Sequence, residues 1–261
     1  MNISLKGKKA LVGGSSKGIG RAVAVQLAAS GATVTVMARS KEQLQELVQA
    51  LPAREGQAHS YLEVDFSDLD GYIETIRYFL GENPVDILVN NTQGPAAGNS
   101  LEKTTSDYQQ AFDLLFKTVH ETTMLALPHM KQQKWGRIIN VASVSVKEPL
   151  PYLALSNTIR AAVVTWAKTL ATDAGPYGIT VNNILTGYFD TDRISQLNQK
   201  KAEQMGVPAD QVRTEMESKV PVGRIGRPEE YGFLVAFLAS DKASYLTGTS
   251  IPLDGGLLKS M

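Results

Sequence analysis

The stretch Leu11-Val12-Gly13-Gly14-Ser15-Ser16-Lys17-Gly18-Ile19-Gly20-Arg21 follows a short apolar run and leads into an amphipathic one. Glycines between a strand and a helix let the backbone turn tightly and approach a pyrophosphate, which then binds the N-terminal N–H groups of the helix. Three glycines alone are a weak signal, but the strand before them and the helix after them supply the context that such a motif requires. The stretch therefore predicts a nucleotide-binding α/β fold.

Short β-rich runs alternate with amphipathic runs along the rest of the chain, which predicts parallel strands joined by right-handed helical crossovers. Residues 87–89 and 138–141 are apolar without alternation, as expected of strands buried on both faces. We therefore expect a Rossmann-type, doubly wound parallel sheet of about seven strands with helices on both faces. The expected strands are 9–12, 33–37, 61–64, 87–90, 137–141, 180–185 and 250–253, and the expected helices are 21–29, 41–51, 69–80, 106–130, 152–174 and 229–239.

The composition is that of a globular protein, since 43% of the 261 residues are hydrophobic and 20% are charged. Lys and Arg together number 26, as do Asp and Glu, so no net field favours nucleic acid or anionic lipid. The chain has no cysteine and its three histidines stand apart, so we expect no disulfide and no metal site. It shows neither a signal peptide nor an apolar run near the ~20 residues that span a bilayer, which favours a cytoplasmic location.

The chain has no repeat, low-complexity tract or Pro/Gly-rich linker, which favours one domain over residues 1–261. Within it, residues 190–219 are polar and long for a connection. We interpret the region 188–220 as a substrate lid or specificity loop. The alternative is an inert surface excursion of one or two helices.

The end of the second expected strand, Ala38-Arg39-Ser40, indicates the choice of cofactor. Enzymes that use NAD tend to place an acid near this point to hold the ribose 2′-hydroxyl, whereas an arginine suits the 2′-phosphate of NADP. The guanidinium fork matches phosphate oxygens, and Lys17 in the glycine-rich stretch can add a second cation. We therefore expect NADP(H) as the cofactor.

The spacing Gly14-x-x-x-Gly18-x-Gly20 resembles the T-G-x-x-x-G-x-G motif of the short-chain dehydrogenase/reductase family, with Gly13 in place of the threonine. The resemblance extends over residues 5 to 258 and is strongest to the β-ketoacyl-carrier-protein reductase branch. Further matching stretches are Val64-Asp65-Phe66, Asn90-Asn91-Thr92-Gln93 for N-N-A-G, the strand leading to Ser143, Leu185-Thr186-Gly187 for the P-G motif, Tyr245–Gly248 and Leu253–Gly256. The cofactor-binding residues that the resemblance implies are Gly14, Ser16, Lys17, Gly18, Ile19, Gly20, Arg39, Ser40, Asp65, Phe66, Asn91, Thr92, Arg160, Thr186 and Gly187.

Family members reduce a carbonyl by hydride transfer, and the resemblance implies four catalytic roles. A serine holds the carbonyl oxygen, a tyrosine gives the proton, a lysine lowers the tyrosine pKa, and an asparagine holds a relay water. Ser143 fits the serine, but the register places Ser156 at the tyrosine position and Arg160 at the lysine position. The asparagine position falls on Leu115, so three of the four roles are changed together.

These replacements predict altered proton chemistry. Serine is a much weaker acid than a phenol of pKa ~10, and arginine cannot shuttle a proton. If a helix begins near Pro151, then Tyr152, Ser156 and Arg160 share one face, and Tyr152 becomes a candidate for the missing donor. Tyr152 packing against or capping the helix start is the alternative.

Three functions remain open. The first is an NADP(H)-dependent oxidoreductase that reduces a carbonyl, such as that of a 3-oxoacyl group, to an alcohol with a non-standard proton donor. The second is a catalytically silent NADP(H)-binding scaffold, acting as a sensor or as a partner subunit. The third is a non-redox relative similar to halohydrin dehalogenases, which also place an arginine at the lysine position. We expect a small-molecule or acyl-thioester substrate, and the resemblance implies a homotetramer or homodimer.

Overall fold

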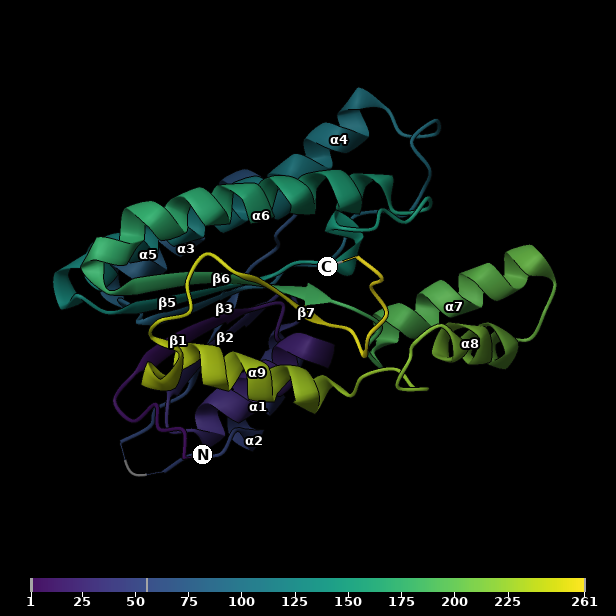
Figure 1. Cartoon of the computed structure of the whole chain (residues 1–261). Helices are drawn as coiled ribbons and strands as arrows, with labels where there is room; N and C mark the ends of the chain where they lie inside the picture. Colours follow the sequence, from purple (N-terminus) through teal and green to yellow (C-terminus); the bar gives the residue numbers. More distant parts are fainter. Residues whose placement is uncertain (1, 55, 261) are drawn as a thin grey trace.

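One parallel sheet of seven strands, in the order β3-β2-β1-β4-β5-β6-β7, forms the centre of the molecule (Figure 1). The computed structural model describes residues 2–54 and 56–260. The predicted doubly wound parallel sheet is confirmed, and every predicted strand is present with bounds within one residue. The strands are β1 (Lys9–Gly13), β2 (Thr33–Ala38), β3 (Ser60–Glu63), β4 (Ile87–Asn90), β5 (Gly136–Val141), β6 (Ile179–Thr186) and β7 (Ser250–Leu253).

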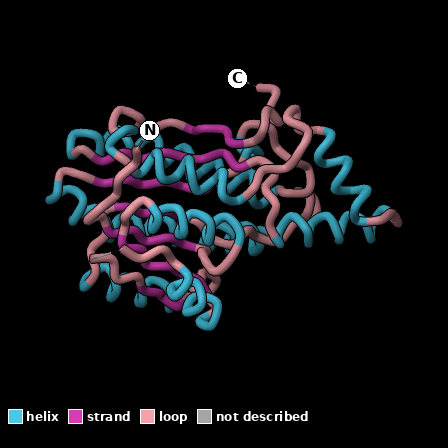
Figure 2. The backbone as a smooth tube through the Cα atoms, turned by 90° about the horizontal axis from the view of Figure 1, so that it is seen from below, coloured by secondary structure: helices cyan, strands magenta, loops and turns pink. Residues whose placement is uncertain are grey.

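Helices cover both faces of the sheet, with α3, α5 and α6 on one face and α1, α2 and α9 on the other (Figure 1). Helices α7 and α8 lie beyond the carboxyl ends of the strands in both Figure 1 and Figure 2. The helices are α1 (Gly18–Ala29), α2 (Lys41–Ala50), α3 (Leu69–Glu82), α4 (Thr105–Phe112), α5 (Thr118–Gln133), α6 (Ala154–Ala174), α7 (Asp192–Met205), α8 (Ala209–Ser218) and α9 (Pro228–Ala239). Within the described residues, no helix is both long and apolar enough to cross a membrane.

The predicted helix 106–130 is interrupted by a π-helical turn at Asp113–Lys117, between α4 and α5. The Thr118 hydroxyl donates to the Leu114 carbonyl at 2.6 Å within this stretch. Such turns insert an extra residue into a helix and are frequent at functional sites. Here the turn contains Leu115, which is buried against Leu155 and Ile159 of α6.

The hypothesis for Tyr152 required the helix that contains Ser156 to begin near Pro151, and the structure does not meet this condition, because α6 begins at Ala154. Two backbone hydrogen bonds hold the preceding residues beside another loop: Gly98 N–H donates to Tyr152 O at 2.8 Å, and Ala154 N–H donates to Gly98 O at 3.2 Å. This bridge between Gly98 and Leu153 delays the first helical turn. Tyr152 therefore lies outside the helix and does not share its face with Ser156.

A chain of buried amides crosses the sheet near the carboxyl ends of its central strands. Asn90 on β4 donates to the side-chain oxygen of Asn140 on β5 at 2.8 Å, and Asn140 donates to that of Asn183 on β6 at 3.0 Å. Asn183 continues the chain to the Ser250 hydroxyl on β7 at 3.3 Å. Because buried polar groups are costly without partners, this chain selects the relative register of four strands where the loops of the cleft begin.

The start of α9 predicts a measurable pH effect on stability. The Glu230 carboxylate accepts hydrogen bonds from the Arg224 guanidinium at 2.7 and 2.8 Å and from the Arg227 backbone N–H at 2.7 Å. Arg224 first, then the N–H of Arg227, lowers the pKa of Glu230 to about 2 from its ordinary 4.5. A carboxyl whose pKa is lowered by folding stabilises the native state above its unfolded pKa and loses this contribution as the pH falls toward the folded value.

We therefore expect Glu230→Gln to lower the free energy of unfolding modestly at neutral pH, since exposed ion pairs are weak. The difference from the wild type should shrink as the pH falls from 4.5 to about 2, because over this range the unfolded chain binds a proton at this carboxyl and the native state does not. Urea unfolding at several pH values measures it. A difference that stayed constant over this range would contradict the assigned pKa.

Candidate active site

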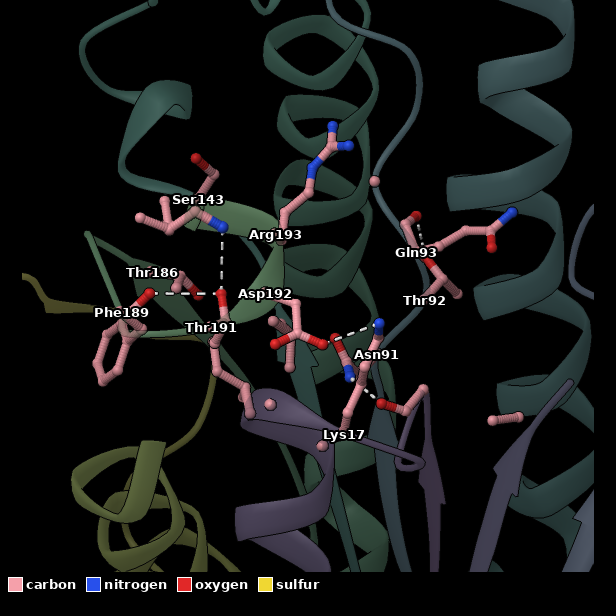
Figure 3. Close-up of a pocket in the computed structure, with 18 of the residues that line it drawn as sticks. Lys17, Asn91, Thr92, Gln93, Ser143, Thr186, Phe189, Thr191, Asp192 and Arg193 are labelled. Carbon is pink, nitrogen blue, oxygen red and sulfur yellow. Dashed lines mark hydrogen bonds and ion pairs between the residues drawn. The ribbon is translucent and has the colours of Figure 1, made fainter. Parts of the chain in front are cut away.

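A cleft of about 670 Å³ lies at the carboxyl ends of the strands, between the glycine-rich loop after β1 and helix α7 (Figure 3). It brings together sixteen of the residues predicted from the sequence, which come from the ends of strands β1 to β6, from the start of α1 and from α6. These residues are Gly14, Ser16, Lys17, Gly18, Ile19, Gly20, Arg39, Ser40, Phe66, Asn91, Thr92, Ser143, Ser156, Arg160, Thr186 and Gly187. Two predicted residues, Asp65 and Tyr152, do not line it.

The glycine-rich loop leaves no room for side chains. A Cβ on Gly20 would lie 2.2 Å from the Gly14 carbonyl oxygen, and Gly18 has a φ of +57°, which favours glycine. The Ser15 hydroxyl, which donates to Val12 O and accepts from Met37 N–H at 2.8 Å, ties the loop to β1 and β2. The Asn91 amide, which donates to Gly13 O at 3.0 Å, ties it to β4.

The first turn of α1 offers backbone donors to the cleft. Its N-cap residue, Lys17, makes no side-chain capping hydrogen bond, and the first turn contains no acidic residue. The N–H groups at a helix start have no partner within the helix, and the helix dipole favours an anion there. The loop and this helix start therefore fit the pyrophosphate of a dinucleotide.

At the end of β2, Arg39 and Ser40 line one part of the cleft, and Phe66 lines it from the neighbouring strand end. Arg39 is exposed, which leaves its guanidinium accessible to a phosphate. Asp65 is also exposed, and its carboxylate accepts from the Ser67 hydroxyl at 2.6 Å and from the Ser67 N–H at 2.9 Å. These bonds first, and the charge of Arg39 last, lower the pKa of Asp65, so it is an anion near Arg39. An adenine contact for Asp65 stays a prediction.

The placement of Arg39 predicts a cofactor preference that can be reversed. We expect Arg39→Asp to weaken NADPH binding about 10- to 100-fold, because a charged hydrogen bond to phosphate is lost and a repulsive charge is added. NADH, which lacks that phosphate, should bind at least as well as before. Fluorescence titration with each dinucleotide measures both dissociation constants.

The control is Arg77→Asp, an equal change of charge at an exposed position of α3 outside the cleft. Equal losses for NADPH and NADH would refute the preference.

At the other end of the cleft, Ser143 follows β5 and faces residues of α6. Its hydroxyl donates to the Ser145 hydroxyl at 2.8 Å and accepts from the Ser145 N–H at 3.1 Å, which limits its rotation. Ser156 and Arg160 lie one helical turn apart on α6, and both line the cleft. Arg160 donates from Nη1 to the carbonyl of Val141, the last residue of β5. The site therefore holds two hydroxyls and a guanidinium.

Tyr152 pairs with Tyr188 outside the cleft lining. Burial first, then its neighbour Tyr188, raises the pKa of Tyr152 to about 12, although the residue as a whole is 45% exposed. The phenol is thus a weaker acid than free tyrosine. Both its position and its pKa make it a poor candidate for the missing proton donor.

The start of α7 contacts both walls of the cleft, a feature that the sequence did not predict (Figure 3). Asp192 forms an ion pair with Lys17 of the glycine-rich loop at 3.0 Å. Its neighbour Arg193 donates from Nη2 to the Pro95 carbonyl at 3.1 Å, on the loop after β4. We call these two contacts the α7 clamp. Their partners are 175 and 98 residues apart in sequence, so no local pattern could have revealed them.

Tyr231 of α9 is a second residue that the sequence did not reveal. It is fully buried, its hydroxyl lies 3.1 Å from the Thr186 hydroxyl, and its ring packs edge-on against Phe189 at 5.4 Å. Thr186 stands where the resemblance places a proline, so this hydrogen bond uses the hydroxyl that replaces the proline ring. The pair supports the end of β6 beneath the cleft. In the sequence, a tyrosine in an apolar helix is typical of core packing.

Fold and cleft together define a dinucleotide-binding α/β protein. A family model described as enoyl-(acyl carrier protein) reductase matches residues 14–258. The chain belongs to the short-chain dehydrogenase/reductase family, in the branch of the 3-oxoacyl-[acyl-carrier-protein] reductases, as its motifs predicted. This is a family of NAD(P)-dependent oxidoreductases that act on carbonyl and alcohol groups.

Relatives across nearly the whole chain support this placement. The chain is 30% identical to the 3-oxoacyl-[acyl-carrier-protein] reductase FabG of Chlamydia pneumoniae, covering 98% of this chain and 99% of the relative. It is also 30% identical to the NADPH-dependent reductase BacG of Bacillus subtilis, covering 97% and 99%. The structure of L-sorbose reductase from Gluconobacter frateurii, solved with NADPH and L-sorbose, is similar with a TM-score of 0.92 at 28% identity over 100% of both chains.

Proposed function

We propose that the protein is an NADP(H)-dependent oxidoreductase that reduces a carbonyl to an alcohol without the tyrosine that usually donates the proton. The observation that carries the proposal is a single cleft that unites the glycine-rich loop and Arg39 at one end with Ser143 at the other. NADPH complexes and NADPH-dependent activity among the relatives support the choice of cofactor. When bound, NADPH supplies a hydride to the carbonyl carbon and becomes NADP⁺, while the carbonyl oxygen takes a proton from solvent.

In this proposal, Ser143 and Ser156 orient the carbonyl oxygen by hydrogen bonding, and Arg160 binds the ribose of the cofactor and adds positive charge beside the developing oxyanion. Arginine stays charged near neutral pH and cannot pass on a proton. The side chain of Leu115, buried in the π-helical turn, is apolar and offers no hydrogen bond to a relay water. Correct positioning alone can supply a large part of a rate enhancement, so a slower reductase is consistent with these residues.

Tyr152 is left out of the proposed proton path. We expect Tyr152→Phe to leave the rate of carbonyl reduction unchanged, because the residue lies outside the cleft lining and its phenol is a weaker acid than usual. Steady-state kinetics on the variant measure this. A large loss of kcat with unchanged NADPH affinity would restore Tyr152 as the donor.

The region 188–220, which contains α7 and α8, is proposed to act as the lid of this cleft. The α7 clamp supports this role, and so does the bidentate contact of Arg213 on α8 with Asp190 at 3.1 and 3.2 Å, which ties α8 to the start of the region. A single domain over residues 1–261, a cytoplasmic location, and a homotetramer or homodimer stay predictions.

A catalytically silent NADP(H)-binding scaffold is the second candidate. The replacements at Ser156, Arg160 and Leu115 favour it, because each removes a group on which the usual proton relay depends. A non-redox function is a weaker third candidate, since the glycine-rich loop that would bind the dinucleotide is retained.

Single-turnover oxidation of enzyme-bound NADPH tests the proposal. The protein is loaded with NADPH and mixed with ketones, aldehydes and 3-oxoacyl thioesters, and the loss of nicotinamide absorbance is followed. Oxidation with one substrate class would establish a reductase. Tight NADPH binding without oxidation would favour the scaffold, and absence of NADPH binding would leave the non-redox candidate.

A further inference from the structure

The charges that line the cleft are unbalanced, although the whole chain is neutral. Lys17, Arg39, Arg160 and Arg193 line it, against a single carboxylate, that of Asp192. Arg39 lies at the end of β2, where the 2′-phosphate of NADP is expected, and Lys17 lies in the loop that fits the pyrophosphate. The remaining two cations, Arg160 and Arg193, lie toward Ser143 and Ser156. The cofactor's reduced nicotinamide and its ribose carry no negative charge that would neutralise them.

Arg193 projects from the first turn of α7 into the reaction end of the cleft. Figure 3 draws it between Ser143 and the stretch Thr92–Gln93. One of its nitrogens donates to the Pro95 carbonyl, and a Cβ placed on Gly94 would lie 3.6 Å from the same nitrogen. A guanidinium has five N–H donors in a planar fork, so the contact with Pro95 leaves donors for a ligand. Within residues 2–54 and 56–260, no carboxylate lies within ion-pair distance of Arg193 or Arg160.

Arg160 lies close enough to Arg193 for the two charges to influence each other. Burial first lowers the pKa of Arg160, the nearby Tyr231 opposes this change, and the positive charge of Arg193 lowers it further. Two like charges beside each other in a partly buried site are unfavourable until an anion joins them. The two arginines therefore form an electropositive subsite next to the two serines.

We propose that the substrate is a small ketone that carries a carboxylate, with Arg193 binding the carboxylate and Arg160 adding to the positive potential. This inference rests on the proposed function and specifies its substrate class. The reaction would then be the reduction of an oxo acid to a hydroxy acid. A planar guanidinium and a planar carboxylate match in geometry, which orients the substrate while Ser143 and Ser156 hold its carbonyl oxygen. The uncharged oxoacyl part of a thioester would leave both arginines without an anion.

The test compares 3-oxobutanoate with its uncharged methyl ester as substrates of the NADPH-loaded protein. We expect Arg193→Gln to lower kcat/KM for 3-oxobutanoate about 10- to 100-fold. A loss of this size corresponds to the free energy of one hydrogen bond between charged groups. Loss of the contact with Pro95 affects both substrates alike, so kcat/KM for the methyl ester should fall much less than kcat/KM for 3-oxobutanoate, and the dissociation constant of NADPH should change little. Arg193→Lys, which keeps the charge, should recover part of the loss. The control is Lys200→Gln, which removes a charge from α7 outside the cleft lining and should change nothing.

A second measurement does not depend on turnover. Calorimetry of the NADP⁺-loaded protein compares butanoate with butanamide, its uncharged match. The inference is supported if the wild type binds butanoate more tightly than butanamide and Arg193→Gln does not. This result would hold even if the protein reduces no ketone, and then only the proposed function would fail. Equal binding of the two ligands overturns the inference. So does a loss of NADPH affinity in Arg193→Gln, because Arg193 would then serve the phosphates of the cofactor.

Discussion

The double substitution Ser156→Tyr/Arg160→Lys is expected to raise the rate of NADPH-dependent ketone reduction by about 10²- to 10⁴-fold, the usual contribution of general acid catalysis. Both positions line the cleft and lie one turn apart on α6, so a phenol and an ammonium would stand side by side. The ammonium would lower the phenol pKa and ease proton transfer to the substrate oxygen. Single-turnover rates with bound NADPH measure the gain directly.

The matched control is Ser156→Phe/Arg160→Lys, which adds the same ring without its hydroxyl. It should remain as slow as the wild type. Equal rates for the two double variants would show that the added ring changes substrate positioning rather than proton transfer. Loss of NADPH binding in both would show that Arg160, which donates to the Val141 carbonyl, is needed to shape the cofactor site.

The second large effect concerns stability. We expect Asn140→Asp to lower the free energy of unfolding by about 3–5 kcal/mol, since it leaves a buried charge without a counter-charge. Asn140 is 1% exposed, and its amide group donates to the Asn183 oxygen at 3.0 Å. A carboxylate there would place two acceptors against each other and break the buried amide chain. Because burial raises the pKa of a carboxyl, the loss should be smaller at acidic pH.

Urea unfolding of both proteins at neutral and acidic pH measures this difference. Asn2→Asp is the control, because it makes the same chemical change at an exposed position near the N-terminus, where the side chain forms no hydrogen bond with the described residues. Its effect should stay within about 0.5 kcal/mol. A similar small effect at Asn140 would mean that the amide chain contributes little to the register of the sheet.

Much of the fold could be predicted because its signals are local. Runs such as Ile138–Val141 are apolar without alternation, and the glycine-rich stretch stands between a strand and a helix. The start of α6 was mispredicted because it depends on a backbone bridge between Gly98 and Leu153, which are far apart in sequence. The π-helical turn at Asp113–Lys117 gave no signal either, since one extra residue barely changes the helical pattern.

The cofactor end of the site was predicted more fully than the reaction end. Its residues follow strand ends in a motif of fixed spacing, whereas the α7 clamp and the contact of Tyr231 with Thr186 join segments that the sequence does not connect. Arg193 appeared in the sequence only as one cation among several in a polar region. Its position against Pro95 gives it a role that charge patterning alone could not distinguish from solvation.

The α7 clamp also bears on the order of events in a catalytic cycle. Because Asp192 and Arg193 are adjacent, one movement of the first turn of α7 breaks both contacts at once. The dinucleotide and the substrate would then enter the cleft through the same opening beside α7. A substrate that bound first would obstruct the entry of the larger cofactor. The expected kinetics are ordered, with NADPH entering first and NADP⁺ leaving last. Competitive product inhibition between NADP⁺ and NADPH alone, with mixed patterns for every other pair, is the signature of such a cycle.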